Sequence, residues 1–385
     1  MGASGGSRFL SLRYAIPVIF WLTIRPLSVG LRAQETTTVG GYGELHYNEP
    51  DGSARGTLDL HRFVIYLGHS FNENLTFKSE VEIEHTKIEA TETGGATGGE
   101  VAVEQAYLDW HFNNQIGLKA GLILLPIGII NQLHEPPTFN GVERPNFDDV
   151  IIPTTWREAG GGIYGSFSQG VSYQLYVVAG LRAGEFNGTE GIREGRQEGL
   201  ESSAGNPSLT GRLETVPVLG LKLAGSFFLG NTSDGNDALG DATLSVLCGD
   251  IQYSLGQFSG RAEGALEHLS NTEQINDTFA PFPRLASRMH GYYLEGAYNV
   301  LPFFSAETDQ LLNLFGRYER FNTQADFEGT VSLLDPDGRN DREEITVGAT
   351  FKPTYNTAFK ADYQFFNNQA GLNTKQLNLG VAYSF

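Results

Sequence analysis

The chain has 385 residues, a formal net charge of −19 and a single cysteine, Cys248. The acidic balance argues against nucleic acid as a partner, because phosphate binding requires clustered lysine and arginine. One cysteine excludes an internal disulfide and a cysteine metal cluster. Glycine, at 48 residues, and aromatic residues, at 11%, are both abundant, which is typical of many strands joined by tight turns.

Residues 1–33 are predicted to be a signal peptide. Arg8 and Arg13 precede an apolar run at residues 15–24, which is too short for a membrane-spanning helix and suits the core of an export signal. Cleavage after Ala33 would leave residues 34–385; the alternative is a buried N-terminal helix. The apolar stretch at residues 121–130 is interrupted by Pro126, so a helical membrane protein is excluded.

From there on, segments with apolar residues at every second position follow one another. Leu108 and Trp110, for instance, alternate with Asp109 and His111, and a period of two predicts a strand with two different faces. Short connections alternate with long ones along the chain. The short ones lie near residues 72–74, 113–115, 168–170, 217–220, 255–257, 300 and 352–356, and the long ones near 48–56, 89–100, 127–156, 183–206, 231–240, 270–286, 323–342 and 367–374.

Seven short turns and eight long loops separate sixteen strands, an even number. This rhythm predicts an all-β fold, a transmembrane antiparallel β-barrel over residues 34–385 with short periplasmic turns and long extracellular loops. Lipid offers the backbone no hydrogen bonds, so the sheet must close. A soluble all-β protein such as a propeller also shows alternation, but charges in series, as in Lys78-Glu80-Glu82-Glu84, favour the membrane. The expected location is the outer membrane of a diderm bacterium, with lipid as a partner.

A barrel of this size leaves a water-filled channel. After cleavage at Ala33, only about five residues would precede the first strand near Val39, too few to form a plug. A passive pore for small ionic solutes is therefore predicted. Any single lumen charge is explained most simply by the need for a wettable wall, since charged rings select ions only at the narrowest point. Strand parity turns these residues inward: Arg62, Lys78, Glu80, Glu82, Glu84, Asp109, Lys119, Arg212, Glu214, Lys222, Arg261, Glu263, Glu267, Arg317, Glu319, Lys360 and Asp362.

The third long loop, residues 127–156, is rich in proline and apolar residues. A loop in bulk water has little reason to carry that apolar surface, so we expect it to fold into the barrel, where long irregular segments are usually functional. The alternatives are an exposed loop and a trimer contact. The residues expected to narrow the pore are His134, Glu135, Glu143, Arg144, Asn146, Asp148 and Asp149.

The stretches "HEPPTFNGVERPNFDDVIIPTTWREAGGGIYG", "AYLDWHFNNQIGLKAGLILLPIG" and the terminal "VAYSF" resemble the outer-membrane porins of the phosphate-selective porin O and P family. The resemblance covers most of residues 34–385. It implies a sixteen-stranded barrel that is trimeric and passes small anions such as phosphate. The lysines and arginines to which that family's phosphate passage is attributed cannot be matched to positions here, and the acidic balance departs from an anion pore. A cation-preferring general porin and a structural or adhesive barrel without an open channel are the alternatives.

Neither a cofactor nor a metal site is predicted, and no enzyme is expected. Ser270 and His268 share a strand face, but nothing marks an orienting acid or an oxyanion hole.

The last ten residues, "QLNLGVAYSF", form a strand pattern that runs to Phe385. We expect this strand to close the barrel against the first one, near residues 39–47, with Leu379 facing lipid and Tyr383 in the periplasmic aromatic girdle. Phe385 resembles the C-terminal signal that the barrel-assembly machinery reads, which makes that machinery an expected partner.

Overall fold

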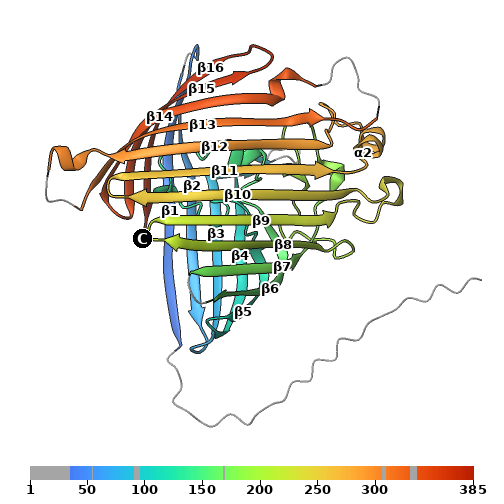
Figure 1. Ribbon diagram of the computed structural model, residues 1–385, viewed down its shortest axis with the longest axis horizontal. Coiled ribbons are helices and arrows are strands. Elements are labelled where there is room, and N and C mark those ends of the chain that lie inside the picture. Colours follow the sequence, from blue (N-terminus) through green and yellow to red (C-terminus); the bar gives the residue numbers. More distant parts are fainter. Residues whose placement is uncertain (1–34, 54, 91–95, 168–169, 306–308, 330–335) are drawn as a thin grey trace, which may run out of the picture. The chain divides into compact units, whose positions relative to one another are not determined.

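The computed structural model describes residues 35–385 except 54, 91–95, 168–169, 306–308 and 330–335. The predicted signal peptide, residues 1–33, lies outside the described residues. Within the described part of the chain, sixteen strands form one antiparallel sheet in which each strand pairs with its neighbours in sequence (Figure 1). The first strand pairs with the last, so the sheet is a closed barrel. The predicted barrel of about sixteen strands is confirmed.

The strands range in length from 8 to 18 residues. Their bounds are β1 Thr36–Pro50, β2 Thr57–Ser70, β3 Leu75–Ala90, β4 Ala96–Asn113, β5 Ile116–Leu124, β6 Arg157–Phe167, β7 Val171–Val178, β8 Ser208–Val218, β9 Leu221–Asn231, β10 Thr243–Leu255, β11 Phe258–Leu269, β12 Arg288–Asn299, β13 Leu311–Asp326, β14 Asp341–Thr354, β15 Thr357–Asn368 and β16 Thr374–Ser384.

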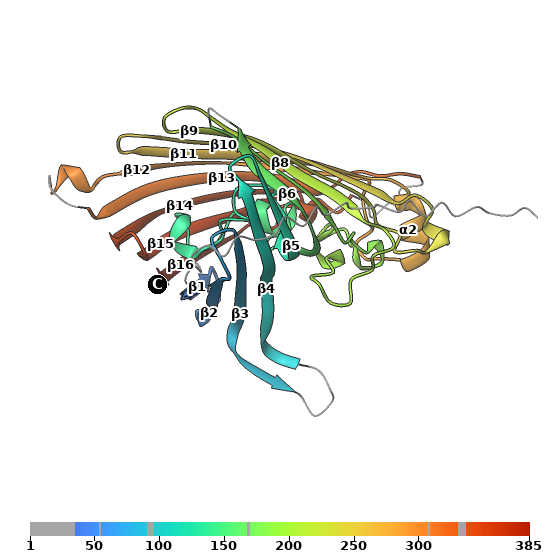
Figure 2. The same cartoon turned by 90° about the horizontal axis from the view of Figure 1, so that it is seen from below.

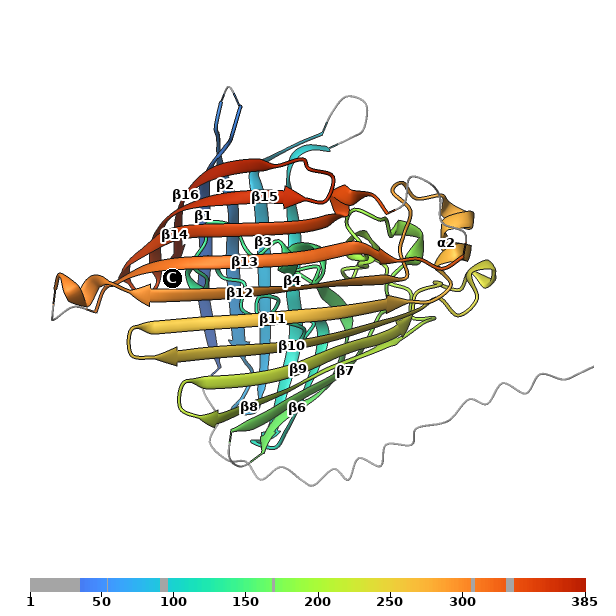
Figure 3. The same ribbon diagram turned by 45° about the horizontal axis from the view of Figure 1, so that its top comes forward.

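Helices are confined to the connections. The α-helices are α1 Phe147–Val150 and α2 Thr272–Phe279, and the 3-10 helices are η1 Pro136–Thr138, η2 Ala183–Glu185, η3 Arg193–Gly195, η4 Asp237–Leu239, η5 Leu301–Phe303 and η6 Gly338–Asn340. No helix in the described residues combines the length and hydropathy needed to span a membrane. The loop that carries α2 and other long loops gather at one end of the strands, and short turns lie at the other (Figure 3). The β12–β13 connection, predicted as a short turn, is longer and contains η5.

The outer face of the barrel is apolar and the inner face is charged. Leu108 on β4 and Leu314 on β13 are exposed, whereas Asp109 and Arg317 on the same two strands are buried. A soluble barrel would show the reverse, with apolar side chains packed inside. The outward apolar band is the surface expected to contact lipid.

Two bulges change which residues face inward. Glu80 pairs with Gln105 and Val81 with Val103, which leaves Glu104 as an extra residue on β4. Simple alternation would turn Glu104 outward with Ala106 and Leu108, but its side chain is fully buried. On β2, His61 is the extra residue between the pairs Glu44–Arg62 and Leu45–Leu60. Bulges re-aim side chains in this way.

The seam between β1 and β16 extends from the pair Tyr42–Ser384 to the pair Pro50–Gln376. Beyond the strand, the N–H of Phe385 donates to the carbonyl of Gly41 at 2.8 Å, and the Phe385 carbonyl accepts from the Gly41 N–H at 3.0 Å. Leu379 and Val381 are exposed, as expected for a lipid-facing row. The predicted pairing of the last strand with the first is confirmed.

Candidate functional site inside the barrel

The connection between β5 and β6, the third long loop, lies inside the barrel. Its residue Glu143 accepts from Asn48 on β1 at 2.9 Å, and the Ile129 N–H donates to Glu263 on β11 at 2.9 Å. A segment that bonds to strands on all sides of a closed sheet can lie only within it (Figure 2). Further bonds join it to β7, β8, β12, β13, β14 and β15: Gln132–Gln174, Gly128–Arg212, Asn140–Glu295, Phe147–Glu319, Asn146–Glu344 and Val142–Asp362.

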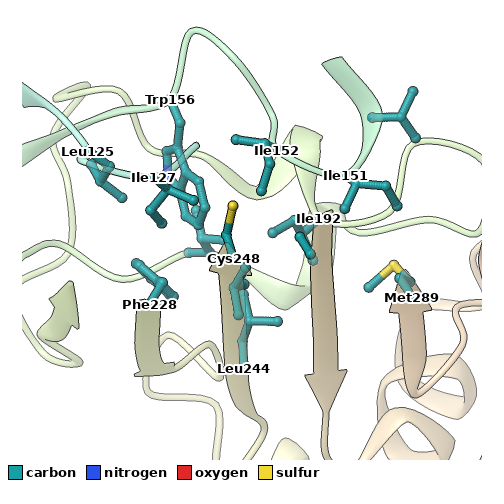
Figure 4. Packing of buried hydrophobic residues seen from close by; sticks show 14 of the residues in the cluster. Leu125, Ile127, Ile151, Ile152, Trp156, Ile192, Phe228, Leu244, Cys248 and Met289 are labelled. Carbon is teal, nitrogen blue, oxygen red and sulfur yellow. The ribbon is translucent and has the colours of Figure 1, made fainter. Parts of the chain in front are cut away.

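Apolar residues at the two ends of this loop pack on one side of the inner wall. Ile127, Ile152 and Trp156 are fully buried, and the Trp156 ring lies 4.8 Å from that of Phe228 on β9. Figure 4 shows these side chains together with Leu244 from β10 and others. The buried apolar area fastens the loop, because each large side chain removed from water contributes about 1.5–3 kcal/mol.

Charged wall residues hold the tip of the loop by its backbone. Arg317 donates to the carbonyls of Glu143 and Arg144 at 3.4 and 3.3 Å, and it pairs with Glu319 at 2.8 Å. Lys360 donates to the carbonyls of Pro136 and Gly141, each at 2.7 Å. Both cations are buried. They satisfy loop carbonyls that would otherwise be unpaired away from bulk water.

His134 fastens the loop to the opposite wall. Its Nε2 lies 3.4 Å from a carboxylate oxygen of Glu104 and 3.9 Å from one of Glu80. Tyr42 donates its hydroxyl to the same Glu104 oxygen at 3.0 Å. Burial alone would lower the pKa of His134, but the adjacent Glu104 carboxylate outweighs it, and the pKa is raised. The protonated imidazole is therefore the form that the fold favours.

A cavity of about 430 Å³ lies on the long-loop side of the loop. Burial acts to raise the pKa of Glu143, which lines it, but the bond from His46 prevails and holds that pKa at about 2. Burial and the neighbouring Arg193 lower the pKa of Arg196 to about 10, so both groups are charged at neutral pH. The charged and histidine residues of the lining are Glu44, His46, His61, Arg62, Glu82, Glu84, His85, Glu100, Glu143, Arg144, Asp149, Arg157, Arg193, Glu194, Arg196 and Glu198.

A second cavity, also about 430 Å³, lies on the short-turn side. Tyr107, Lys119, Tyr164, Arg212 and Lys222 are among its lining residues. A third, of about 540 Å³, lies beside the seam, where Glu80, Glu135 and Phe385 line it. The loop thus stands between water-accessible spaces at the two ends of the barrel.

The seven loop residues predicted to narrow the pore do not share one position. Glu143, Arg144, Asn146 and Asp149 line the first cavity, and Glu135 lines the third. His134 is buried against Glu104. Asp148 is fully buried and lines none of the three cavities. Burial, and next the neighbouring Glu263, raises the pKa of Asp148 well above its ordinary value, which favours the neutral acid.

Most of the cations predicted to face inward pair with a carboxylate inside the barrel. Arg62 is 2.7 Å from Glu44, and Arg212 forms a two-pronged contact with Asp250 at 2.7 and 3.0 Å. Lys119 lies over the rings of Tyr107 and Tyr164 at 5.2 and 5.1 Å. Further pairs are Lys78–Asp109, Lys222–Glu214, Arg261–Glu295 and Arg317–Glu319. Arg62, Arg212 and the cations of these four pairs are thus neutralised locally, whereas Lys119 contacts aromatic rings and Lys360 donates to loop carbonyls.

The fourth loop, residues 179–207, also contributes to the first cavity. Arg193 pairs with Asp149 of the third loop at 2.8 Å, and Arg196 donates to the carbonyl of Pro153 at 2.9 Å. No site residue was predicted in this loop. A signal was present, because Leu181, Phe186 and Ile192 give it the same unusual apolar content, and all three are buried. Other residues missed were Arg157, Glu104, His46, His61 and His85.

The chain is similar in sequence to one curated protein and similar in fold to solved outer-membrane proteins. No family model matches the chain. An uncharacterized protein of Aquifex aeolicus (strain VF5) is 37% identical over 345 residues, which cover 86% of this chain and 76% of that protein.

Two solved structures share the architecture at low identity. The outer membrane channel DcaP of Acinetobacter baumannii has a TM-score of 0.56 and 11% identity, covering 92% of this chain and 99% of that one. An anion-selective porin from Comamonas acidovorans has a TM-score of 0.55 and 13% identity, covering 91% and 100%. The fold is therefore that of outer-membrane porins, while membership of the phosphate-selective family stays a prediction from the sequence.

Proposed function

The chain belongs to the same family as the Aquifex aeolicus protein, and because it has the fold of outer-membrane porins, we propose that it is an outer-membrane porin. It forms a water-filled channel through which small ions and solutes diffuse passively. The location follows from the apolar outer face of the barrel, which needs lipid to cover it.

The observation that carries this proposal is the third loop within the barrel. It bonds to strands around the wall and stands between two cavities with charged linings. A loop held across a charged lumen sets the cross-section through which a solute passes. Glu143, Arg144 and Asp149 then form the constriction together with Arg193 and Arg196 of the fourth loop.

Planar lipid bilayers test the proposal directly. The purified protein is expected to give stepwise increases in conductance at constant step size. Protein heated until the barrel unfolds is the matched control and should give none. A folded barrel that inserts without conducting steps would overturn the porin assignment.

We propose further that the constriction prefers small anions of the phosphate class. Arg144, Arg157, Arg193 and Arg196 line the first cavity. Arg144 has no carboxylate partner among the ion pairs of the described residues; it donates to the Thr155 hydroxyl at 3.3 Å. A guanidinium in that state is available to an anion. The resemblance to phosphate-selective porins and the anion-selective Comamonas neighbour support the same preference.

The reversal potential across a salt gradient measures this preference. The wild-type potential should have the anion sign, and Arg144→Glu should shift it towards cations. Arg288→Glu is the control, because Arg288 is exposed and pairs with Asp326 away from the cavity. A wild-type potential of the cation sign would reject the anion preference and leave a cation-preferring general porin.

A structural barrel without an open channel is the second candidate, and the density of the interior favours it. Glu104, Asp148 and Glu319 are fully buried inside the barrel, and two loops occupy its lumen. The bilayer experiment separates the two, since a structural barrel gives no conducting steps.

The remaining features of the proposal concern assembly. We propose a homotrimer, export through the predicted signal peptide at residues 1–33, and insertion by the barrel-assembly machinery. Chemical cross-linking in native membranes tests the first of these: a ladder that ends at three copies is expected, and one that ends at a single copy would contradict it.

A further inference from the structure

Three histidines and an aspartate gather at the wall of the first cavity, on β1, β2 and β3. His61 and His85 line the cavity, and both direct Nδ1 at one oxygen of Asp59, at distances of 3.3 and 2.6 Å. One ligand atom from each of these three residues lies within 4.8 Å of the others. We propose that Asp59, His61 and His85 bind a divalent transition-metal ion of the zinc, nickel or copper class.

Backbone irregularities place the two imidazoles here. His61 is the extra residue of the bulge on β2, which turns it inward with Arg62. His85 has a φ of 47° and lies where the β3–β4 register breaks after Glu84. Left-handed backbone is uncommon for a residue other than glycine, and such conformations concentrate at functional sites. Regular strands would not aim both rings at Asp59.

The donor set identifies the class of ion. Imidazole nitrogen suits zinc, copper and nickel, whereas calcium and magnesium prefer oxygen ligands. In a tetrahedral site the ligand atoms lie about 3.3 Å apart. The Asp59–His61 separation already equals this value, and the Asp59–His85 pair, at 2.6 Å, must open by about 0.7 Å. The His85 side chain is about half exposed.

His46 on β1 packs against His61 of this site. Its Nε2 lies 3.0 Å from Glu44 and its Nδ1 3.1 Å from Glu143, so both nitrogens already have partners. Its ring stacks on that of His61 with centroids 4.7 Å apart and planes 13° apart. This stacking restricts the orientation of the His61 ring.

Three protein ligands leave a coordination position open. His61 and Asp59 side chains are about a quarter exposed, and the cavity gives an ion a path from solvent. Water, or a solute in the cavity, would complete the coordination, as in open zinc sites. The proposal is independent of conduction, because binding can be measured on the folded barrel in detergent.

The test is isothermal titration of the folded protein with ZnCl₂, using protein purified without a histidine tag. One ion per barrel is expected. The double variant His61→Ala/His85→Ala should bind at least about tenfold more weakly, whereas His111→Ala, an exposed histidine on β4 outside the cavity, should bind as the wild type does. The absence of binding by wild type, or retention by the folded double variant, would overturn the proposal.

Two further measurements keep the assignment falsifiable. His134 with Glu80 and Glu104 forms another group whose ligand atoms lie close together, so loss of binding in His134→Ala with retention in the double variant would place the ion there instead. Electron paramagnetic resonance of the Cu²⁺-loaded wild type requires no variant to fold. Hyperfine coupling to two imidazole nitrogens is expected, and coupling to none would reject the site.

Discussion

At the scale of single residues, His134 ties the third loop to a carboxylate that a bulge turns into the barrel. The groups that face its imidazole are Glu104, Glu80, Arg144 and the Tyr42 hydroxyl. Burial opposes its charge, yet Glu104 prevails and raises its pKa above the ordinary 6.5. A raised pKa in the folded state means that the stabilisation is complete below pH 6.5 and is lost as the pH rises through the raised pKa.

Replacing the carboxylate should remove this pH dependence. Glu104→Gln is expected to cost about 1–3 kcal/mol of folding stability at low pH, since a buried charge-assisted bond is lost. Its unfolding temperature should also fall less than that of the wild type as the pH rises. Thermal unfolding in detergent between about pH 5.5 and 9 measures both effects.

The control for this experiment is Glu100→Gln. Glu100 lies on the same strand with an exposed side chain at the cavity wall. The Glu100→Gln variant should show the same dependence of unfolding temperature on pH as the wild type. If Glu104→Gln also keeps the wild-type slope, His134 does not carry the pH dependence.

The inward position of Glu104 was not predicted from the alternating pattern of the sequence. Alternation predicts which charged residues of a strand share a face, because lipid on one side and water on the other enforce a period of two. A bulge breaks that period. Its signal was in the chain: apolar positions change from Val101 and Val103 to Ala106 and Leu108, which requires one extra residue between them.

At the scale of elements, the path of the third loop can be fixed by a disulfide. A Cβ built on Gly380 of β16 would lie 3.6 Å from the Cβ of Val142, within the range of natural disulfides. Val142→Cys/Gly380→Cys should therefore form the bond on mild oxidation, detected by mass spectrometry. The native Cys248 is buried and should not compete.

The matched control pairs Val142→Cys with Gly316→Cys. A Cβ at Gly316 has no atom within 4 Å, and this residue faces outward on β13. Only the first pair should cross-link. Failure of the Gly380 pair in a folded barrel would mean that the loop tip does not rest on β16.

The two long inward loops differ in how well the sequence revealed them. Four prolines and several Ile and Leu residues made residues 127–156 conspicuous. The acids Glu194 and Glu198 made the fourth loop resemble a solvated surface segment, yet both line the first cavity. Ion pairs such as Arg157–Glu198 at 2.8 Å satisfy them there. Pairing between loops depends on tertiary placement, which no local pattern in either loop encodes.

At the scale of the whole barrel, Phe385 allows assembly to be distinguished from stability. Its backbone bonds to Gly41 do not involve the ring, so Phe385→Ala should change refolded stability by less than about 1 kcal/mol, as surface substitutions do. If the ring is the recognition signal, the same variant should insert poorly into the outer membrane of cells. Membrane fractionation and in vitro refolding measure the two quantities.

Tyr355→Ala is the comparison for Phe385. Tyr355 is an exposed aromatic residue in the β14–β15 turn and lines the same cavity near the seam. The Tyr355→Ala variant should insert into the outer membrane as the wild type does. Equal membrane levels of the Phe385 variant and the wild type would reject the recognition role.

The bonds of the loop tip also impose an order of events. Glu143 is bonded to Asn48 on β1, and Val142 is bonded to Asp362 on β15, so the tip touches strands on both sides of the seam. Those bonds can coexist only after β1 has met β16. Before that pairing, the loop tip lacks at least one of these two bonds. The loop tip therefore has its full set of bonds only in the closed barrel.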